Sequence, residues 1–289
     1  MALLALVLVT AVWGVTFVQV KDAVAVYPLF AFLTLRFAIA SVVLAAPAVR
    51  RLSSLGRTGA GWALGLGLLL AAGYGLQTAG LARTTVSSAG FITGLYVVLT
   101  PLIALALFRQ GVGAGAWLGV ALATGGLAML SGIHGGSVLG DALVLAGAAA
   151  YSLQIVLLER IAPRYDPLAL TLLEMLAALG GFAVIALARG DLRVPHGWTV
   201  WGALLVTGVF ASALAFLVQT WAQQRTSATR TALAFTMEPV FAALFGFTLA
   251  GDRLGALGWA GCAVILAGIV LAEPAAASTL RRLVTGSRH

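Results

Sequence analysis

The sequence predicts an all-α polytopic membrane protein with ten transmembrane helices in two inverted five-helix repeats. Three observations predict this class. The 289 residues are 61% hydrophobic and only 9% charged, whereas soluble domains have about 25% charged residues. The chain divides into apolar stretches close to the roughly 20 residues that a helix needs to cross a bilayer. Side-chain patterns of the first half also recur in the second half at a constant spacing.

The apolar stretches predict ten spanning helices joined by short connections, none of which is long enough to form a soluble domain. The first stretch lacks the basic start and the cleavage site of a signal peptide, so we interpret it as a span. The third and fourth spans form a hairpin joined by Arg83 and Thr84. The expected spans are residues 2–20, 29–49, 61–82, 85–108, 114–132, 138–158, 166–188, 198–223, 228–250 and 256–273.

The distribution of Lys and Arg predicts that both termini lie on the cytoplasmic side, because basic residues accumulate in cytoplasmic loops. With the N-terminus inside, eleven of the 17 Lys and Arg residues fall inside, five fall outside and Arg36 lies within a span. The net charge of +8 is spread over loops and the end of the chain, so it does not indicate nucleic-acid binding. Residues 274–289 are expected to form a basic cytoplasmic tail.

Two patterns repeat along the chain at the same offset of 142 positions. A YxxQT motif that starts at Tyr74 recurs as FxxQT from Phe216, and a glycine-containing motif that starts at Trp117 recurs from Trp259. With five helices in each half, the second half begins on the opposite side of the membrane, which is an inverted-topology repeat. The predicted units are residues 1–132 and 133–273.

Near the start of each half the offset is close to 138, and Trp13 then corresponds to Tyr151. Pro101 and Pro239 are also 138 positions apart. Either the halves contain compensating gaps, or the two proline breaks differ in depth by about one helical turn. Inverted repeats of this kind form transporters whose substrate site lies at the repeat interface near the bilayer midplane.

Glu238 lies in the apolar stretch Thr231–Phe247, where a carboxylate costs about 2.5–3.5 kcal/mol on insertion scales and must face protein or water. It either binds a proton or a substrate amine, or it is a structural acid paired with a backbone group or with Arg36. Arg36 is the second candidate charge, and extension of its side chain to the outer face is the alternative. Glu174 is a weaker candidate within the seventh span.

A set of aromatic and uncharged polar residues shares helix faces and predicts a pocket for an aromatic or amphipathic solute. The alternative is that these side chains pack the helices or tie them together. The candidates for substrate binding are Trp13, Thr16, Phe17, Tyr74, Gln77, Thr78, Phe91, Tyr96, Tyr151, Gln154, Phe216, Gln219 and Phe235.

The sequence contains no pattern of catalytic, cofactor or metal-ligating residues, so we expect neither an enzyme nor a bound cofactor or metal. The three His residues fall in loops or in the tail, and the single cysteine, Cys262, is interpreted as a packing residue. A channel is disfavoured because no ring of repeated carbonyls or charges is evident. Glycines such as Gly119 and Gly261 indicate close helix packing, with a dimer interface as the alternative, so we expect a monomer or weak dimer.

Several motifs, in this order, resemble the EamA family of the drug/metabolite transporter superfamily: Trp13-Gly14, Leu35-Arg36-Phe37, the run Arg225–Ala232, Glu238-Pro239-Val240 and the Gly-rich last helix of each half. The resemblance implies ten helices in two inverted repeats and export of small metabolites from the bacterial cytoplasm across the inner membrane. Within the family, the chain looks most similar to the YddG-type exporters of aromatic amino acids. Family repeats often carry an acid after the fourth helix, but the first half has Gln110 where the second has Asp252.

We therefore expect a secondary active transporter that exports small metabolites, with aromatic amino acids as the favoured substrates. Its expected partners are the lipid bilayer and the solute, and the interpretation in which Glu238 binds a proton would add a coupled proton. The alternative within the same superfamily is an exporter of drugs, lipophilic cations or other amino acids.

Overall fold

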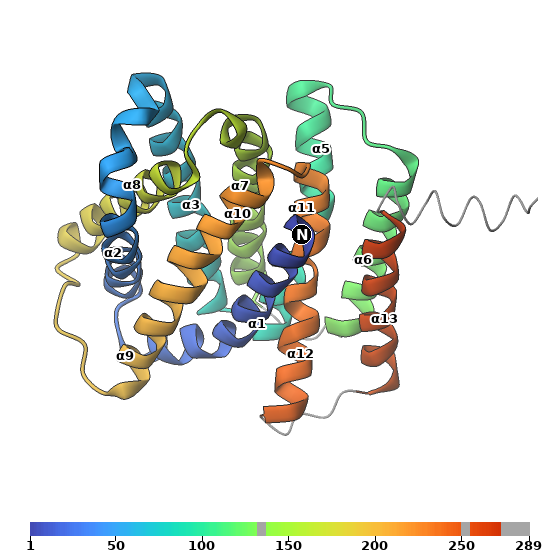
Figure 1. Cartoon of the computed structure of the whole chain (residues 1–289). Coiled ribbons are helices and arrows are strands. Elements are labelled where there is room, and N and C mark those ends of the chain that lie inside the picture. The colour runs from blue at the N-terminus through green and yellow to red at the C-terminus, as the bar shows by residue number, and fades with distance from the viewer. Residues whose placement is uncertain (132–136, 250–254, 273–289) are drawn as a thin grey trace, which may run out of the picture.

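The computed structural model describes residues 1–131, 137–249 and 255–272, and these residues form helices with no strand among them (Figure 1). Asp252 and the tail 274–289 lie outside the described residues. The helices are, in chain order, α1 (Ala2–Val26), α2 (Leu29–Ala48), η1 (Val49–Leu55), α3 (Gly56–Leu81), α4 (Val86–Gly94), α5 (Tyr96–Phe108), α6 (Ala114–Ser131), α7 (Val138–Ile161), η2 (Ala162–Arg164), α8 (Pro167–Ala188), α9 (Trp198–Leu205), η3 (Val206–Leu214), α10 (Ala215–Gln223), α11 (Ala228–Phe235), α12 (Met237–Leu249) and α13 (Ala256–Leu271).

Six helical stretches among the described residues are long and apolar enough to cross a membrane, and α6 and α13 are shorter apolar helices. One of the six, Leu29–Leu81, joins α2, η1 and α3 without interruption. Large apolar side chains such as Leu8, Val42, Leu68 and Val184 remain more than half exposed on the outer helix faces. Such a surface is suited to lipid. The prediction of an all-α polytopic membrane protein is confirmed at this level.

Two of the expected spans are each built from two helices. The stretch 85–108 divides at Leu95 between α4 and α5, and the stretch 228–250 divides at Thr236 between α11 and α12. Pro101 lies inside α5, and Pro239 is the third residue of α12. The prolines therefore do not occupy corresponding places relative to the two breaks.

The first helix of each broken span begins with a hydroxyl cap. The Thr85 side chain accepts a hydrogen bond from the backbone N–H of Ser88 at 3.0 Å, and the Ser227 side chain accepts one from Arg230 at 3.4 Å. A capping oxygen satisfies one of the free N–H groups at a helix start and contributes about 1 kcal/mol. These caps fix the starts of α4 and α11 at positions that are 142 residues apart.

The expected span 198–223 is helical throughout but contains the π-helical segment η3 between α9 and α10. A π segment widens the helix and often occurs at functional sites. Here it crosses α2, where a Cβ atom on Gly208 would lie 3.1 Å from the Arg36 carbonyl oxygen. Close approach of the two backbones therefore requires glycine at this position.

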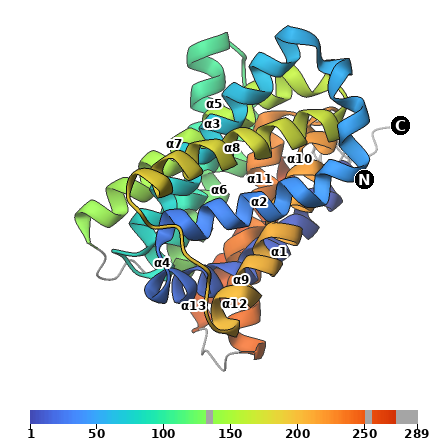
Figure 2. The ribbon, with the colours of Figure 1, turned by 90° about the vertical axis from the view of Figure 1, so that its left-hand side faces the viewer.

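The helix α3 lies between α7 and α8, and α2 lies along α8 on the face shown in Figure 2. Aromatic residues such as Phe32, Phe37 and Phe182 fill the core between these helices. A Cβ atom on Gly67 would lie 2.3 Å from the Glu174 carbonyl oxygen, so the α3–α8 contact is made through backbone. The same close packing is expected wherever small residues line a helix interface in a membrane.

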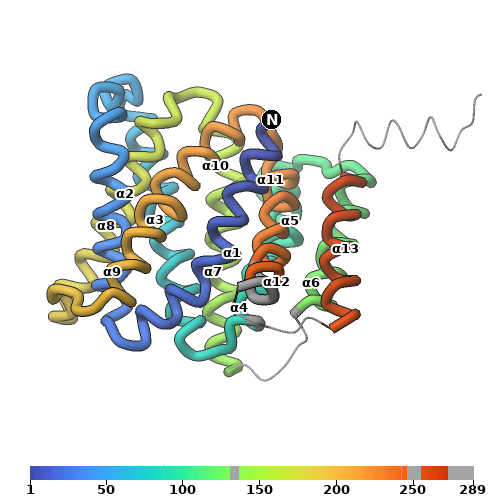
Figure 3. The backbone as a smooth tube through the Cα atoms, turned by 60° about the horizontal axis from the view of Figure 1, so that its bottom comes forward, coloured from blue at the N-terminus to red at the C-terminus, as the bar shows by residue number. Residues whose placement is uncertain are grey.

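The helices α6 and α13 form a pair at one edge of the molecule (Figures 1 and 3). A Cβ atom on Gly119 would lie 2.7 Å from the Gly268 carbonyl oxygen, and one on Gly126 would lie 2.7 Å from the Gly261 carbonyl oxygen. Glycine at these sites brings the two helices to backbone contact. The glycine pattern of the sequence therefore corresponds to packing within the chain.

Candidate functional site

A cavity of about 680 Å³, including the space at its mouth, lies among α1, α2, α3, α4, α5, α7, α10, α11 and α12. Helices from both ends of the sequence thus contribute to one site. The lining residues are Trp13, Thr16, Phe17, Val20, Arg36, Tyr74, Gln77, Thr78, Leu81, Thr93, Tyr96, Tyr151, Gln154, Ile155, Phe216, Gln219, Phe235 and Glu238.

Of the candidate residues named from the sequence, all except Phe91 and the weaker candidate Glu174 line this cavity. Phe91 instead packs, partly buried, against a separate apolar cluster that contains Val97 and Leu127. The cavity also includes Val20, Leu81, Thr93 and Ile155, which carry no charge and belong to no motif. Val20 follows Phe17 by three residues, and Leu81 follows Thr78 by three. The i, i+3 spacing of a helix face would therefore have identified both as lining residues.

Aromatic rings form a continuous wall of the cavity. Tyr74 contacts Phe216 with ring centroids 6.0 Å apart, and Phe216 contacts Trp13 at 5.8 Å. Trp13 then contacts Phe235 at 4.8 Å, and Phe235 contacts Tyr96 at 6.1 Å. Most of these pairs are tilted or edge-to-face, which favours the attraction between ring edges and faces. The wall offers apolar, polarisable surface to a ring-bearing solute.

The carbonyl group of Ala211, in the π segment η3, anchors two of the lining side chains. The indole N–H of Trp13 donates to it at 2.9 Å, and the Arg36 guanidinium donates to it at 3.4 Å. A carbonyl oxygen has two lone pairs, so it can accept from these side chains in addition to any bond within the helix. The π segment thereby orients both the indole ring and the buried cation.

Arg36 is only 3% exposed and faces the cavity from α2. Its Nε donates to Ser212 Oγ at 2.8 Å, and Nη2 donates to the Tyr74 hydroxyl at 3.2 Å. The guanidinium also lies over the Tyr74 ring, 4.5 Å from its centroid. The interpretation that Arg36 extends to the outer face is therefore wrong, because the side chain is held inside the protein.

Glu238 is 7% exposed and faces the cavity from the first turn of α12. The Tyr96 hydroxyl donates to its Oε2 at 3.5 Å, a long contact. Within the described residues the ion pairs are Arg51–Asp166 and Arg189–Asp191, so Glu238 does not pair with Arg36. The cavity thus contains a cation and a carboxyl group that do not neutralise each other directly.

Amide side chains from α3, α7 and α10 complete the polar lining. Gln77 donates to Thr93 Oγ1 at 2.9 Å and accepts from the Tyr151 hydroxyl at 3.1 Å. Gln219 donates to Gln154 Oε1 at 3.1 Å. Gln154 Nε2 and Gln219 Oε1 are buried without a hydrogen-bond partner among the described residues. An unused buried donor and acceptor at a cavity wall is available to a bound solute or water.

The cavity extends towards the face at which α1 and α3 end. Its lining includes Val20, near the end of α1, and Leu81, the last residue of α3. Phe17 and Gln77 on the same helices are partly exposed, whereas Gln154 and Gln219 are each 1% exposed. Val20 and Leu81 are themselves 7% and 2% exposed, so the lining at this end combines buried and partly exposed side chains.

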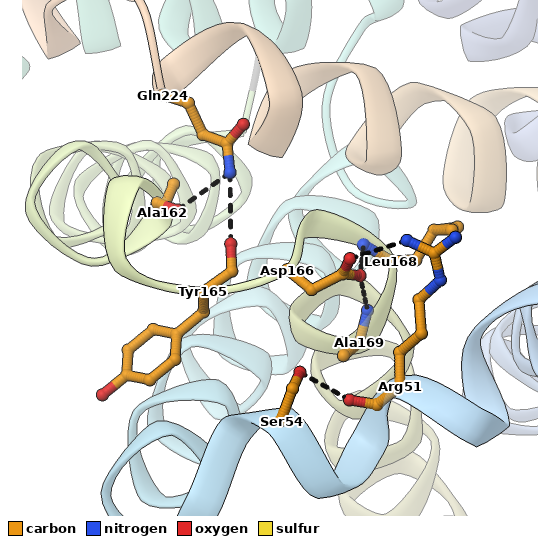
Figure 4. Close-up of polar contacts among 8 residues, drawn as sticks. All are labelled: Arg51, Ser54, Ala162, Tyr165, Asp166, Leu168, Ala169 and Gln224. Atoms are coloured by element: carbon orange, nitrogen blue, oxygen red, sulfur yellow. Dashed lines mark hydrogen bonds and ion pairs between the residues drawn. The ribbon is translucent and has the colours of Figure 1, made fainter.

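The face that carries the N-terminus is tied by an ion pair between two connections (Figure 4). Arg51 Nη1 of η1 lies 2.8 Å from Asp166 Oδ2. The other Asp166 oxygen caps α8 by accepting from the N–H groups of Leu168 and Ala169. Partial burial opposes ionisation, but the hydrogen bonds and the charge of Arg51 outweigh it and lower the Asp166 pKa below its ordinary 3.8.

Gln224 adds a second tie on this face, immediately after α10. Its Nε2 donates to the carbonyl oxygens of Ala162 and Tyr165 at 3.0 and 3.1 Å, as Figure 4 shows. The preceding residue, Gln223, donates to the Ile155 carbonyl at 2.8 Å. The end of α10 is therefore held to α7 and to the connection that follows it.

The other acids of the described residues lie outside the cavity lining. Glu174 is fully buried at the α3–α8 contact, and its carboxyl oxygens have no partner among the described residues. Asp141 accepts from the Thr84 hydroxyl at 2.6 Å. Gln110 donates to Glu159 at 3.3 Å. The contacts of Asp141 and Glu159 lie at helix ends, whereas Glu174 lies in the middle of α8.

The fold and the cavity together define a polytopic helical membrane protein with an internal solute-sized site. The sequence profile of the EamA-like transporter family matches residues 1–132 and 138–272, so the chain belongs to this family of membrane transporters. It is 31% identical to an uncharacterized transporter of Archaeoglobus fulgidus over 275 residues, 93% of this chain and 84% of that protein.

A second relative, an uncharacterized transporter of Synechocystis sp., is 26% identical over 285 residues, 90% of this chain and 86% of that protein. A solved crystal structure of a protein matches the fold with a TM-score of 0.80 at 21% identity, covering 96% of this chain and 98% of that one. The resemblance recognised in the sequence is thus confirmed at the level of the family.

Proposed function

We propose that this protein is a secondary active transporter that exports aromatic amino acids across the bacterial inner membrane by alternating access. Both termini lie in the cytoplasm, and Trp13, Gln77, Tyr151, Gln219 and their neighbours in the cavity form the substrate site. The observation that carries this proposal is the cavity itself, which combines an aromatic wall with buried, unused hydrogen-bonding groups. Small-molecule sites have this composition, and an aromatic side chain matches it well.

The proposal includes two inverted five-helix units, residues 1–132 and 133–273, each with its fourth span broken. Several contacts support it because they recur between corresponding positions. Trp13 contacts Phe216, and their counterparts Tyr151 and Tyr74 contact each other with centroids 5.3 Å apart. Tyr96 and Glu238, 142 positions apart, touch each other, as expected for residues beside a two-fold axis.

The glycine contacts between α6 and α13 also support a two-fold axis that relates the two halves. Gly119 meets Gly268, and the residues 142 positions away, Gly261 and Gly126, meet in the same way. The family profile also matches two successive segments of similar length. In this arrangement each half contributes five spans, which gives ten in total.

The two halves are not in equivalent conformations, which supports alternating access. Val20 lines the cavity, but its counterpart Leu158 is fully buried and does not. Leu81 lines the cavity, but its counterpart Gln223 is hydrogen-bonded to α7. With the N-terminus in the cytoplasm, the cavity therefore faces outward, and exchange of the two conformations opens it inward.

Transport by purified protein in liposomes tests the proposal. Trp13→Ala and Gln219→Ala are each expected to lower the initial rate of tyrosine and phenylalanine uptake about tenfold, because each removes a wall contact or a buried hydrogen-bonding group. Trp198→Ala is the control, since this indole is 77% exposed and lies outside the cavity. Unchanged uptake in folded Trp13 and Gln219 variants would contradict the proposed site.

The same liposomes distinguish the substrates and the energy source. Aromatic amino acids are expected to compete with labelled phenylalanine more strongly than a lipophilic cation such as tetraphenylphosphonium. The opposite ranking would favour a drug exporter. Uptake with and without a pH gradient measures proton coupling, which Glu238→Gln is expected to abolish. A gradient-independent rate that is unaffected by this substitution would contradict proton coupling.

A further inference from the structure

The cavity contains charged side chains, which can select a solute by its charge as well as by its aromatic ring. Arg36 is nine-tenths buried, yet among the described residues its partners are two hydroxyl groups, one carbonyl group and aromatic rings. None of these carries a negative charge. A guanidinium ion has five N–H donors, and the hydrogen bonds that Arg36 makes within the described part of the chain use Nε and Nη2.

A buried cation without an anion is costly, because a charge inside a low-dielectric protein needs a partner of opposite sign. The planar guanidinium is suited to bidentate hydrogen bonds with a carboxylate group. Because Arg36 lines the cavity, the missing anion can be supplied by a solute. Ser212, Tyr74 and the Ala211 carbonyl fix the guanidinium in place before the solute arrives.

Glu238 supplies a carboxyl group that faces the same cavity. The chain of ring contacts runs from Tyr74, which Arg36 touches, through Phe216, Trp13 and Phe235 to Tyr96. The Tyr96 hydroxyl is the hydrogen-bond partner of Glu238. Among the described residues, the two side chains therefore face one cavity from α2 and α12 without forming an ion pair with each other.

We propose that Arg36 and Glu238 are specificity-determining residues that bind the two charges of a dipolar solute, Arg36 its carboxylate and Glu238 its ammonium group. The inference rests on the proposed transport of amino acids and adds the rule by which the site selects them. A solute with only one charge leaves the opposite side chain buried without a partner. Such a solute is rejected because an unpaired buried charge is far more costly than a weaker contact.

Binding to the purified, full-length protein tests this rule. The ligands are L-phenylalanine, 2-phenylethylamine, 3-phenylpropionate and L-valine, and their apparent affinities are measured from the rise in unfolding temperature with ligand concentration. Wild-type protein is expected to bind phenylalanine at least tenfold more tightly than either one-charge analogue. Equal affinity for phenylalanine and the one-charge analogues would overturn the proposal without any substitution.

The variants assign each charge to its residue. Arg36→Gln is expected to lower the affinity for phenylalanine and phenylpropionate at least tenfold and to leave the affinity for phenylethylamine within twofold of wild type. Glu238→Gln is expected to have the opposite selectivity: it lowers the affinity for phenylethylamine and leaves the affinity for phenylpropionate unchanged. Arg36→Lys, which keeps the charge but loses the planar fork, is expected to fall between wild type and Arg36→Gln. Glu174→Gln is the matched control for a buried carboxyl group outside the cavity.

The outcomes separate this inference from the proposed function. Equal weakening of all ligands by Arg36→Gln and Arg36→Lys would mean that Arg36 only supports the fold, and would overturn the inference. Transport of phenylalanine with no dependence on the two charges would preserve the proposed function and overturn the inference. Selection of valine over phenylalanine with the same dependence on both charges would preserve the inference and overturn the aromatic preference.

Discussion

At the scale of single residues, the buried polar side chains fall into two groups. In one group the hydrogen-bonding atoms have partners, and in the other at least one such atom has none among the described residues. Thr171 and Thr220 bond to each other at 3.0 Å, and Gln223 and Gln224 reach backbone carbonyls. These residues hold helices together. Gln154 and Gln219 instead keep a free donor and a free acceptor at the cavity wall. Buried groups outside the cavity, such as Glu174, also lack a partner among the described residues, so it is the position of Gln154 and Gln219 in the cavity lining that makes them candidate binding residues.

Asp166 gives a prediction at this scale because it caps α8 and pairs with Arg51. Asp166→Asn keeps a capping oxygen and removes the charge, so it is expected to destabilise the protein by about 0.5 kcal/mol at pH 7, as for a largely exposed ion pair. Because the folded-state pKa lies below the ordinary 3.8, this contribution is present above that pH and is lost as the pH falls through the folded-state pKa.

Thermal unfolding in detergent between pH 7 and pH 3 measures this effect. The difference in unfolding temperature between wild type and Asp166→Asn is expected to shrink as the pH falls. Asp191→Asn serves for comparison, since it breaks an exposed pair with Arg189 two residues away and caps no helix in the structure. A difference for Asp166→Asn that is constant or grows towards pH 3 would mean that the ion pair does not contribute as argued.

At the scale of elements, glycine determines how closely helices approach. α3 contacts α8 and α6 contacts α13 through backbone atoms, at distances that a single methyl group would prevent. In a membrane, where lipid provides no hydrophobic drive between helices, such close contact is a main source of stability. The broken spans are organised by capping instead of by glycine. A hydroxyl cap at Thr85 or Ser227 starts the first helix, and the chain breaks at Leu95 or Thr236 before the second helix begins.

Adjacent glycines on α6 provide a matched pair for testing this packing. A Cβ atom on Gly126 would lie 2.7 Å from the Gly261 carbonyl oxygen, whereas one on Gly125 would meet nothing within 4 Å. Gly126→Ala is therefore expected to destabilise the protein by about 1–3 kcal/mol, the usual range for overpacking. Gly125→Ala is expected to be neutral or slightly stabilising. Equal effects of the two substitutions on the unfolding temperature would contradict the close α6–α13 contact.

The sequence predicts the helical membrane fold because long apolar stretches and sparse charge leave few alternatives. It does not predict the breaks at Leu95 and Thr236, since the prolines that drew attention, Pro101 and Pro239, lie beyond them. The π segment Val206–Leu214 has no sequence signal either, because its extra residue is stabilised by contacts with Trp13 and other distant side chains.

For the site, motif recurrence pointed to Gln77 and Gln219, and charge within an apolar run pointed to Arg36 and Glu238. These are features that a single sequence displays. Thr93 lines the cavity beside Gln77 of the preceding helix α3, which donates a hydrogen bond to it. Such a tertiary contact leaves no pattern in the sequence. Phe91 shares its helix with Thr93 but packs elsewhere, because rotation about the α4 axis places it on another face.

At the scale of the whole molecule, the proposal rests on two related halves that differ in conformation around one cavity. Val20 of α1 lines the cavity, and Leu158, its proposed counterpart on α7, is fully buried in an apolar cluster with Leu66 and Leu170. Exchange of these environments during transport would close one face and open the other. A fixed channel of the same composition would show no such exchange.

Reciprocal thiol labelling during transport tests this claim most directly. Cys262, the only cysteine of the chain, is replaced by serine, and Val20→Cys and Leu158→Cys are introduced singly. Without substrate, Val20→Cys is expected to react with a small maleimide and Leu158→Cys to be protected. Under an imposed substrate gradient, reactivity should fall at position 20 and rise at position 158. Reactivities that stay constant, or that change in the same direction at both positions, would contradict alternating access through this cavity.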